Sequence, residues 1–312
     1  MRFLVVGAGA LGGYFGGRLL EAGEDLSFLL RPRRAAQLAQ TGLVVRSLFG
    51  DLHIPSPPHV LANGIGAPFD VVIVGCKAYD LADTMASFAP AVGPQTAILP
   101  LLNGMRHLDE LAQRFGRERV LGGLCLISAA LDPQGTVLHL NDTHGLTYGE
   151  LDGSRSARVQ ALEAAFSKAR FEARASGEML QEMWEKWIFI ASVAGITCLM
   201  RATIGDIEQG GGAGIASGLL DECAAIAAHN GFAPRAAMIA RARGMLTAAG
   251  SPITASMFKD IQRGAQIEGE HIIGDLLRRA PNDGRDAHLL RIVHAHLKAY
   301  EAGRARTAEA AA

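Results

Sequence analysis

The strongest constraint on the fold is a glycine pattern that directly follows the first apolar segment. Residues 1–6 (MRFLVV) have the apolar, partly β-branched character of a buried parallel strand. Next come Gly7-Ala8-Gly9-Ala10-Leu11-Gly12 and a small-residue helix pattern. We interpret Gly7 as a tight turn, Gly9 as the point where a diphosphate approaches the backbone, and Gly12 as a close helix–strand contact. The pattern predicts a dinucleotide site at the helix N-terminus; a glycine-rich turn without a ligand is the alternative.

The end of the next predicted strand, Asp25 to Leu30, indicates which dinucleotide binds. A site for NAD usually carries an acidic residue here, which accepts a hydrogen bond from the ribose 2′-hydroxyl. This chain instead continues with Arg31-Pro32-Arg33-Arg34. An arginine fork suits phosphate oxygens and offers no acceptor for a hydroxyl. The sequence therefore predicts NADPH, with a solvated basic helix start as the alternative.

Composition excludes several classes of protein. The net charge of the 312 residues is −1, which indicates neither nucleic acid nor an anionic membrane surface as a partner. The four cysteines form no C-x-x-C pair, so we expect no metal site and no disulfide framework, and a reducing cytoplasm. The apolar N-terminus is too short for a signal peptide, and the uncharged run 187–200 is too short for a membrane span.

Strand and helix patterns divide the chain near Ala175. We expect an α/β fold in which an N-terminal Rossmann domain (residues 1–175) precedes an all-helical domain (176–303) and a frayed tail (304–312). The first domain is expected to close with an antiparallel pair, Thr136–Asn141 and Leu146–Gly149. Two long helices are expected in the second, Met179–Arg201 and Ser256–Arg278.

Two polar residues follow predicted buried strands of the first domain. Lys77 comes after Asp70–Val74, and Asn103 comes after Thr96–Pro100. Ligands of doubly wound sheets lie outside the carboxyl ends of the strands, so both residues are candidates for cofactor or substrate contacts. An exposed loop lysine and an ordinary Asn-Gly turn are the alternatives.

Two charges interrupt apolar faces of the predicted helices. Lys186 begins a face that continues through Ile190 and Ala194, where desolvation should lower the lysine pKa toward the range of a useful acid. A surface pair with Glu182 is the alternative. Glu268 lies in the apolar stripe of the later helix and needs a partner, for which Lys186 is the candidate. Ser256, at the start of that helix, is equally suited to be its N-cap.

These segments together resemble the ketopantoate reductases (2-dehydropantoate 2-reductases) over nearly the whole chain. The matching pieces are GAGALGG, the strand-end arginine, GCKAYD, LLNGM, WEKW and SMFKDIQRGAQIE. The resemblance implies a Rossmann domain, a helical domain and NADPH-dependent reduction of a 2-oxo acid. It also implies that Lys186 is the catalytic acid, that Glu268 and Asn103 support it and the nicotinamide, and that Ser256 binds substrate. Arg31 and Lys77 would line the cofactor and substrate site.

The chain departs from this family at two substrate positions. Members that act on ketopantoate typically carry asparagines four and eight residues after the catalytic lysine, where this chain has Ile190 and Ala194. Apolar side chains cannot hydrogen-bond a substrate hydroxyl or carboxylate, which can change discrimination by orders of magnitude. We therefore expect 2-dehydropantoate, the precursor of pantoate in pantothenate biosynthesis, or a more apolar ketone.

Two other functions stay open at this stage. A β-hydroxyacid dehydrogenase or imine reductase has the same two-domain plan, although the run from Ser256 to Glu268 has no reason to occur there. A nucleotide-binding sensor without catalysis is favoured by Ile190 and Ala194 and opposed by the retained Lys186 and Asn103. The apolar helices of the second domain also leave a homodimer open.

Overall fold

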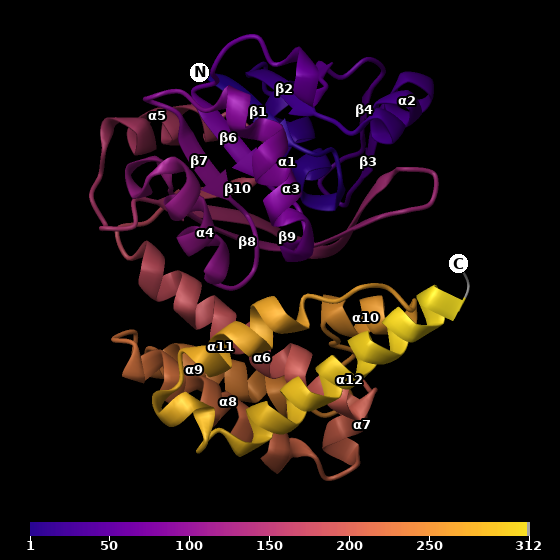
Figure 1. The fold of residues 1–312 in the computed structure, drawn as a ribbon, viewed down its shortest axis with the longest axis vertical. Coiled ribbons are helices and arrows are strands. Elements are labelled where there is room, and N and C mark those ends of the chain that lie inside the picture. The colour runs from indigo at the N-terminus through magenta and orange to yellow at the C-terminus, as the bar shows by residue number, and fades with distance from the viewer. Residues whose placement is uncertain (311–312) are drawn as a thin grey trace. The chain divides into compact units, whose positions relative to one another are not determined.

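The computed structural model describes residues 1–310, which form two compact units (Figure 1). The N-terminal unit contains Met1–Leu102 and His107–Met179, and the C-terminal unit contains Asn103–Arg106 and the chain from Leu180 onward. Every strand of the described residues belongs to the N-terminal unit, and the C-terminal unit is helical. The predicted fold class, a Rossmann-type α/β unit followed by a helical one, is confirmed.

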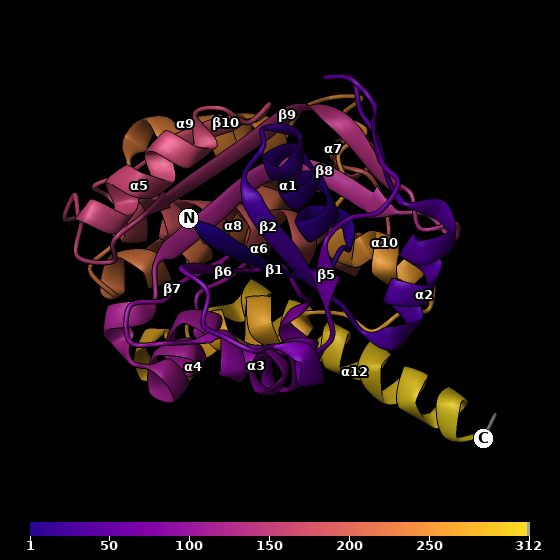
Figure 2. The same cartoon turned by 90° about the horizontal axis from the view of Figure 1, so that it is seen from above.

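A parallel five-stranded sheet forms the dinucleotide-binding half of the N-terminal unit. Its order is β5-β2-β1-β6-β7, and each neighbouring pair is parallel. Figure 2 shows α1 on one side of this sheet and α3 and α4 on the other. The strand order reverses between β1 and β6, which is where doubly wound sheets bind ligands. The strands are Arg2–Val6 (β1), Asp25–Leu29 (β2), His59–Val60 (β5), Val71–Val74 (β6) and Ala97–Pro100 (β7), and the helices are Ala10–Glu21 (α1), Leu81–Phe88 (α3) and Arg106–Phe115 (α4).

A second sheet has the order β10-β9-β3-β4, with β8 paired to β9. The predicted antiparallel pair Thr136–Asn141 and Leu146–Gly149 is wrong, because both pieces belong to one continuous strand, β9, which is antiparallel to β8. Residues 142–145 resemble a turn. The register with β8 shifts here, between Ile127 and Ala129, so the pairing passes from His139 to His144 across a bulge within the strand. The strands are Leu43–Arg46 (β3), Leu52–Ile54 (β4), Gly122–Leu131 (β8), Val137–Gly149 (β9) and Glu172–Ala175 (β10); helices Pro32–Thr41 (α2) and Ala157–Phe166 (α5) complete the unit.

Helix α1 is glycine-rich because it packs closely against both sheets. A Cβ atom at Gly16 would lie 2.6 Å from the ring of Phe28 in β2. On the side of the second sheet, a Cβ at Gly13 would lie 2.8 Å from Val137 in β9. Tyr14 and Phe15 of the same helix are fully buried in the core that the two sheets share. The small residues of the sequence pattern are therefore a packing requirement of a helix between two sheets.

An aromatic and histidine cluster links α1 to β9. The Tyr14 hydroxyl lies 2.8 Å from His144 Nδ1, and the ring of Phe49 stacks on His144 with 3.7 Å between centroids. Burial lowers the pKa of His144, the charges of His139 and Arg18 lower it further, and Glu172 on β10 opposes them. The folded protein therefore favours the neutral form of this imidazole more than the unfolded chain does.

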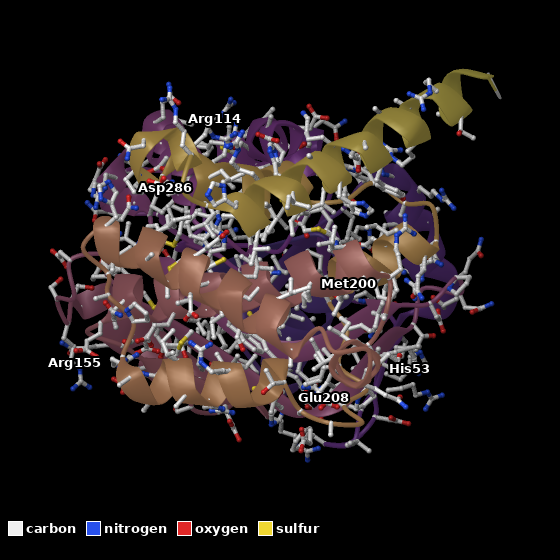
Figure 3. The ribbon with its side chains drawn as sticks, turned by 90° about the horizontal axis from the view of Figure 1, so that it is seen from below. His53, Arg114, Arg155, Met200, Glu208 and Asp286 are labelled. Atoms are coloured by element: carbon white, nitrogen blue, oxygen red, sulfur yellow. The ribbon has the colours of Figure 1, made fainter. Side chains whose placement is uncertain are left out.

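This cluster makes stability depend on pH. Since the pKa of His144 in the folded state lies below its ordinary value of about 6.5, the unfolded chain takes up the proton first as the pH falls. We expect the free energy of unfolding to decrease below about pH 6.5, and His144→Gln to reduce that decrease, in urea unfolding at neutral and mildly acidic pH. His53→Gln, at the exposed His53 of β4 (Figure 3), is the control. Equal pH profiles for wild type and His144→Gln would contradict the assignment.

The C-terminal unit is built around α6, which runs from Met179 to Met200, labelled in Figure 3. By length and composition α6 could cross a membrane, but 72% of its apolar window is buried inside the protein, which identifies a core helix. Trp187, Ile188 and Thr197 are among its fully or almost fully buried residues. The other helices are Ile204–Gln209 (α7), Ala213–His229 (α8), Ala236–Leu246 (α9), Ser256–Gln262 (α10), Asp275–Arg278 (α11) and His288–Ala310 (α12).

The predicted helix Ser256–Arg278 is wrong, because α10 ends at Gln262. Gly264 has φ +67°, a left-handed conformation that interrupts a helix. Helical structure resumes at Gly269 and passes through a π-helical turn, Glu270–Gly274, into α11. The predicted tail also differs, since α12 continues through Ala310. Residues 304–310 are mostly alanine and arginine, which are strong helix formers. Residues 311–312 of that tail lie outside the described residues.

Candidate functional site

The glycine turn after β1 has the geometry that a dinucleotide site requires. Gly7 has φ +85°, and its N–H donates to the Leu29 carbonyl at 2.9 Å. A Cβ at Gly12 would lie 2.1 Å from the Gly7 carbonyl oxygen, so only glycine fits there. No atom lies within 4 Å of the Cβ position of Gly9, the N-cap of α1. The first turn of α1 contains no acidic residue and its N-cap makes no side-chain hydrogen bond, which leaves backbone N–H groups for an anion.

The candidate cations follow the neighbouring strands. Arg31 is the N-cap of α2, directly beyond β2, and its side chain is 70% exposed. Lys77 is half-buried and precedes the 3₁₀ turn Ala78–Asp80 that follows β6. At Gly75, a Cβ would lie 3.5 Å from the Gly12 nitrogen, so the end of β6 lies against the start of α1. The N-terminal unit thus has Gly7–Gly12, Arg31 and Lys77 at the carboxyl ends of three neighbouring strands, β1, β2 and β6.

Arg34, from the same arginine cluster, has a structural role, because its guanidinium bonds to groups within the protein. Its Nε donates to the Ala8 carbonyl at 3.0 Å, and its Nη2 donates to the Gly135 carbonyl at 2.9 Å. Its Nη1 donates to Gln37 Oε1 at 2.6 Å. Because each guanidinium nitrogen bonds within the protein, Arg34 supports the glycine turn, and the arginine cluster divides into structural and exposed members.

In the C-terminal unit, a buried tryptophan fixes the segment that carries Lys186. Lys186 is half-buried on α6, and the adjacent Trp187 is 1% exposed. The Trp187 indole N–H donates to the Ile272 carbonyl at 2.9 Å. Ile272 lies in the π-helical turn, and its own N–H donates to the Glu268 carbonyl at 2.9 Å. Two hydrogen bonds therefore join the backbone of Glu268 to the residue beside Lys186.

A histidine that sequence reasoning missed connects the same turn to Asn103. His271 is 8% exposed, and its Nε2 lies 2.8 Å from the Asn103 carbonyl oxygen. The acceptor is a carbonyl, so Nε2 carries the proton. Gly104 has φ +81°, and a Cβ there would lie 3.1 Å from the His271 ring. His271 follows Glu268 by three residues, and a polar side chain next to Ile272 and Ile273 is the signal that could have identified it.

The remaining candidates lie along the same helix and the segment beside it. Ile190 is half-buried and Ala194 is 1% exposed. The Thr197 hydroxyl of α6 accepts a hydrogen bond from the Ala255 N–H at 3.3 Å. Ala255, not Ser256, is the N-cap of α10, so the N-cap interpretation of Ser256 is wrong. Ser256 is the first helical residue and is exposed, which leaves its hydroxyl accessible to solvent.

The C-terminal unit therefore contains an amide, an ammonium and a carboxylate on segments that hydrogen bonds tie together. Asn103 belongs to this unit although the chain on both sides of residues 103–106 belongs to the other. A cation that can donate a proton and a nearby amide are the groups that stabilise a carbonyl oxygen as negative charge develops.

Comparison with known proteins identifies the family of this chain. The family model described as "Ketopantoate reductase PanE/ApbA" matches residues 3–153, and the model described as "Ketopantoate reductase PanE/ApbA C terminal" matches residues 178–301. The chain belongs to the ketopantoate reductase family. It is accordingly an oxidoreductase of a pyridine-nucleotide-dependent family that acts on small keto acids. This membership favours the ketopantoate reductase interpretation over that of a β-hydroxyacid dehydrogenase or imine reductase.

Several similar proteins match nearly the whole length of this ketopantoate reductase family member. An "Uncharacterized oxidoreductase YkpB" of Bacillus subtilis (strain 168) is 39% identical over 303 residues, 97% of this chain and 99% of that protein. A 2-dehydropantoate 2-reductase of Archaeoglobus fulgidus is 27% identical over 97% of this chain and 98% of its own length. The crystal structure of 2-dehydropantoate 2-reductase from Geobacter metallireducens GS-15 superposes with a TM-score of 0.86 at 28% identity, covering 96% and 99% of the two chains.

The hydrogen bond from His271 should contribute measurably to the stability of the C-terminal unit. We expect His271→Phe to lower the free energy of unfolding by about 1–3 kcal/mol, because the Asn103 carbonyl loses its donor. The chain has two tryptophans, Trp184 and Trp187, both in α6, so their fluorescence during urea unfolding reports on this unit.

His271→Gln is the matched variant, since its amide can donate to the same carbonyl. A smaller loss in His271→Gln than in His271→Phe is the expected order. Equal losses in the two variants would mean that ring packing, and not the hydrogen bond, determines the stability at this position.

Proposed function

We propose that the chain catalyses NADPH-dependent reduction of a 2-oxo acid to a 2-hydroxy acid. The observation that carries this proposal is the pair of hydrogen bonds, Trp187–Ile272 and His271–Asn103, that tie together the segments of three candidate residues. Those residues are Lys186, Glu268 and Asn103. We place the enzyme in the cytoplasm, which agrees with the four cysteines, all among the described residues, being outside any disulfide.

The residues of the N-terminal unit suit a pyridine dinucleotide. The open position beside Gly9 and the first-turn N–H groups of α1 would hold the diphosphate. The guanidinium of Arg31 would bind the 2′-phosphate of NADPH, and Lys77 would assist at the neighbouring strand end. When bound, the cofactor supplies the hydride that reduces the carbonyl carbon.

Lys186 would act as the general acid. Its ammonium would stabilise the negative charge that develops on the carbonyl oxygen and then donate the proton that completes the alcohol. Glu268 would orient that ammonium. The Asn103 side-chain amide would help to position the reacting groups. Asn103 follows the carboxyl end of β7, and the hydrogen bond from His271 fixes its backbone.

The substrate is proposed to be 2-dehydropantoate or a more apolar 2-oxo acid. Ser256, with its exposed hydroxyl at the start of α10, would hydrogen-bond the substrate. Ile190 and Ala194 would offer it apolar contacts only, so the hydroxyl that distinguishes 2-dehydropantoate from trimethylpyruvate should contribute little to recognition at these positions.

The test follows the loss of NADPH absorbance with 2-dehydropantoate and with trimethylpyruvate. We expect turnover with at least one of them, and Lys186→Ala to lower kcat by roughly 10²–10⁴-fold with nearly unchanged affinity for NADPH. Lys298→Ala, at a lysine of α12 that is 64% exposed, is the matched control.

Each result of that test has a defined meaning. Faster reduction of trimethylpyruvate would mean that the pocket favours apolar ketones, and efficient reduction of 2-dehydropantoate would mean that Ile190 and Ala194 are tolerated. Full turnover in Lys186→Ala would remove its role as the acid. Tight NADPH binding without turnover of any 2-oxo acid would replace the reductase proposal with that of a nucleotide sensor.

The choice of cofactor is tested at Arg31. A charge-assisted hydrogen bond contributes about 1.5–3 kcal/mol, so Arg31→Ala should weaken NADPH binding by roughly 10–100-fold and NADH binding much less. Nucleotide fluorescence titrations measure both dissociation constants. Arg33→Ala removes the same charge two residues away, on the exposed side of α2. Equal weakening of both nucleotides in Arg31→Ala would eliminate its role at the 2′-phosphate.

A further inference from the structure

An acidic residue lies beside the arginine that is proposed to bind the 2′-phosphate. Asp80 Oδ1 is 3.4 Å from Arg31 Nη2, and their side chains are 38% and 70% exposed. Asp80 ends the 3₁₀ turn after β6, whereas Arg31 follows β2, and these two strands flank β1 in the sheet. The pair therefore joins the two strand ends on either side of the glycine turn. An exposed ion pair of this kind contributes little to the stability of the fold, so stability alone does not explain why the two side chains are placed together.

The neighbouring arginine cannot replace Arg31 in this role. Arg34 uses Nε, Nη1 and Nη2 in bonds to Ala8, Gln37 and Gly135, and releasing it would remove support from the glycine turn. Of these two arginines, Arg31 is therefore the one whose guanidinium a phosphate would bind, and Asp80 contacts that guanidinium.

The two pyridine nucleotides meet this carboxylate in opposite ways. The 2′-phosphate of NADPH is an anion, so it competes with Asp80 for Arg31 and is repelled by the carboxylate itself. The 2′-hydroxyl of NADH can donate a hydrogen bond to a carboxylate, which is the function of the acidic residue in NAD sites. In those sites the acid usually follows the second strand; here the turn after β6 supplies it.

From this arrangement we propose that Asp80 sets the cofactor preference of the chain by weakening NADPH binding and supporting NADH binding. The inference rests on the proposed role of Arg31 at the 2′-phosphate. Arg31 and Asp80 together form a site with a donor for a phosphate and an acceptor for a hydroxyl. The chain consequently uses both nucleotides, with a smaller preference for NADPH than Arg31 alone would produce.

The experiment measures the dissociation constants of NADPH and NADH for wild type and Asp80→Asn by fluorescence titration. Removing one negative charge beside a phosphate dianion in a solvated site should tighten NADPH binding about tenfold. NADH binding should stay unchanged or weaken a few-fold. Because the effect is a charge effect between exposed groups, it should decrease in high salt.

Two control variants test whether the effect is specific to Asp80 or arises from any negative charge nearby. Asp83→Asn removes the same charge from the exposed face of α3, three residues along the chain, and should leave the ratio of the two dissociation constants unchanged. Asp80→Glu retains the charge and should retain the wild-type ratio within a few-fold.

The outcomes distinguish this inference from the proposed function. If Asp80→Asn leaves the ratio of the NADPH and NADH dissociation constants unchanged, the role of Asp80 is overturned. The same holds if Asp83→Asn changes that ratio equally. A shifted ratio supports it even if no 2-oxo acid is reduced, since the titrations need no turnover. Failure of wild type to bind either nucleotide would overturn both the inference and the proposed function.

Discussion

The close contact between Gly12 and the Gly7 carbonyl is the constraint on which the N-terminal unit depends. A side chain at residue 12 would collide with that oxygen at 2.1 Å, so any other residue would force α1 away from β1. The same helix contacts both sheets through Gly13 and Gly16, and it therefore has no room to move aside. The position of the helix N-terminus, where an anion would bind, follows from this packing, and the bond from Arg34 to the Ala8 carbonyl supports the turn before it.

In the C-terminal unit, hydrogen bonds fix polar residues that come from distant parts of the chain. Lys186 lies on a long regular helix, whereas Glu268 lies where helical structure resumes after a break at Gly264. The π-helical turn that follows contributes the carbonyl of Ile272 to Trp187 and the ring of His271 to Asn103. Irregular helical turns of this kind are frequent at functional sites, because the extra residue per turn changes which side chains share a face.

Much of the fold could be predicted from the sequence, because its signals are local. The strand before Gly7, the helix that follows the glycine turn and the long apolar helix beginning at Met179 depend on short patterns, and the structure confirms them. The continuity of β9 and the end of α10 at Gln262 could not be predicted. In the first case pairing with β8 overrides a turn-like sequence, and in the second a single left-handed glycine interrupts an otherwise helical pattern. The contacts of Asp80 and His271 join residues far apart in the chain, for which a single sequence contains no signal.

The membership of residues 103–106 in the C-terminal unit has a consequence for the modularity of the protein. The chain passes from the N-terminal unit into this short segment and returns at His107, long before the second passage at Leu180. A fragment that starts at Leu180 would contain His271 and Trp187 but would lack the carbonyl that His271 binds. The helical unit therefore cannot be exchanged as one continuous piece of chain. In a chimera that joins it to another nucleotide-binding domain, the residue in place of Asn103 would come from that other domain.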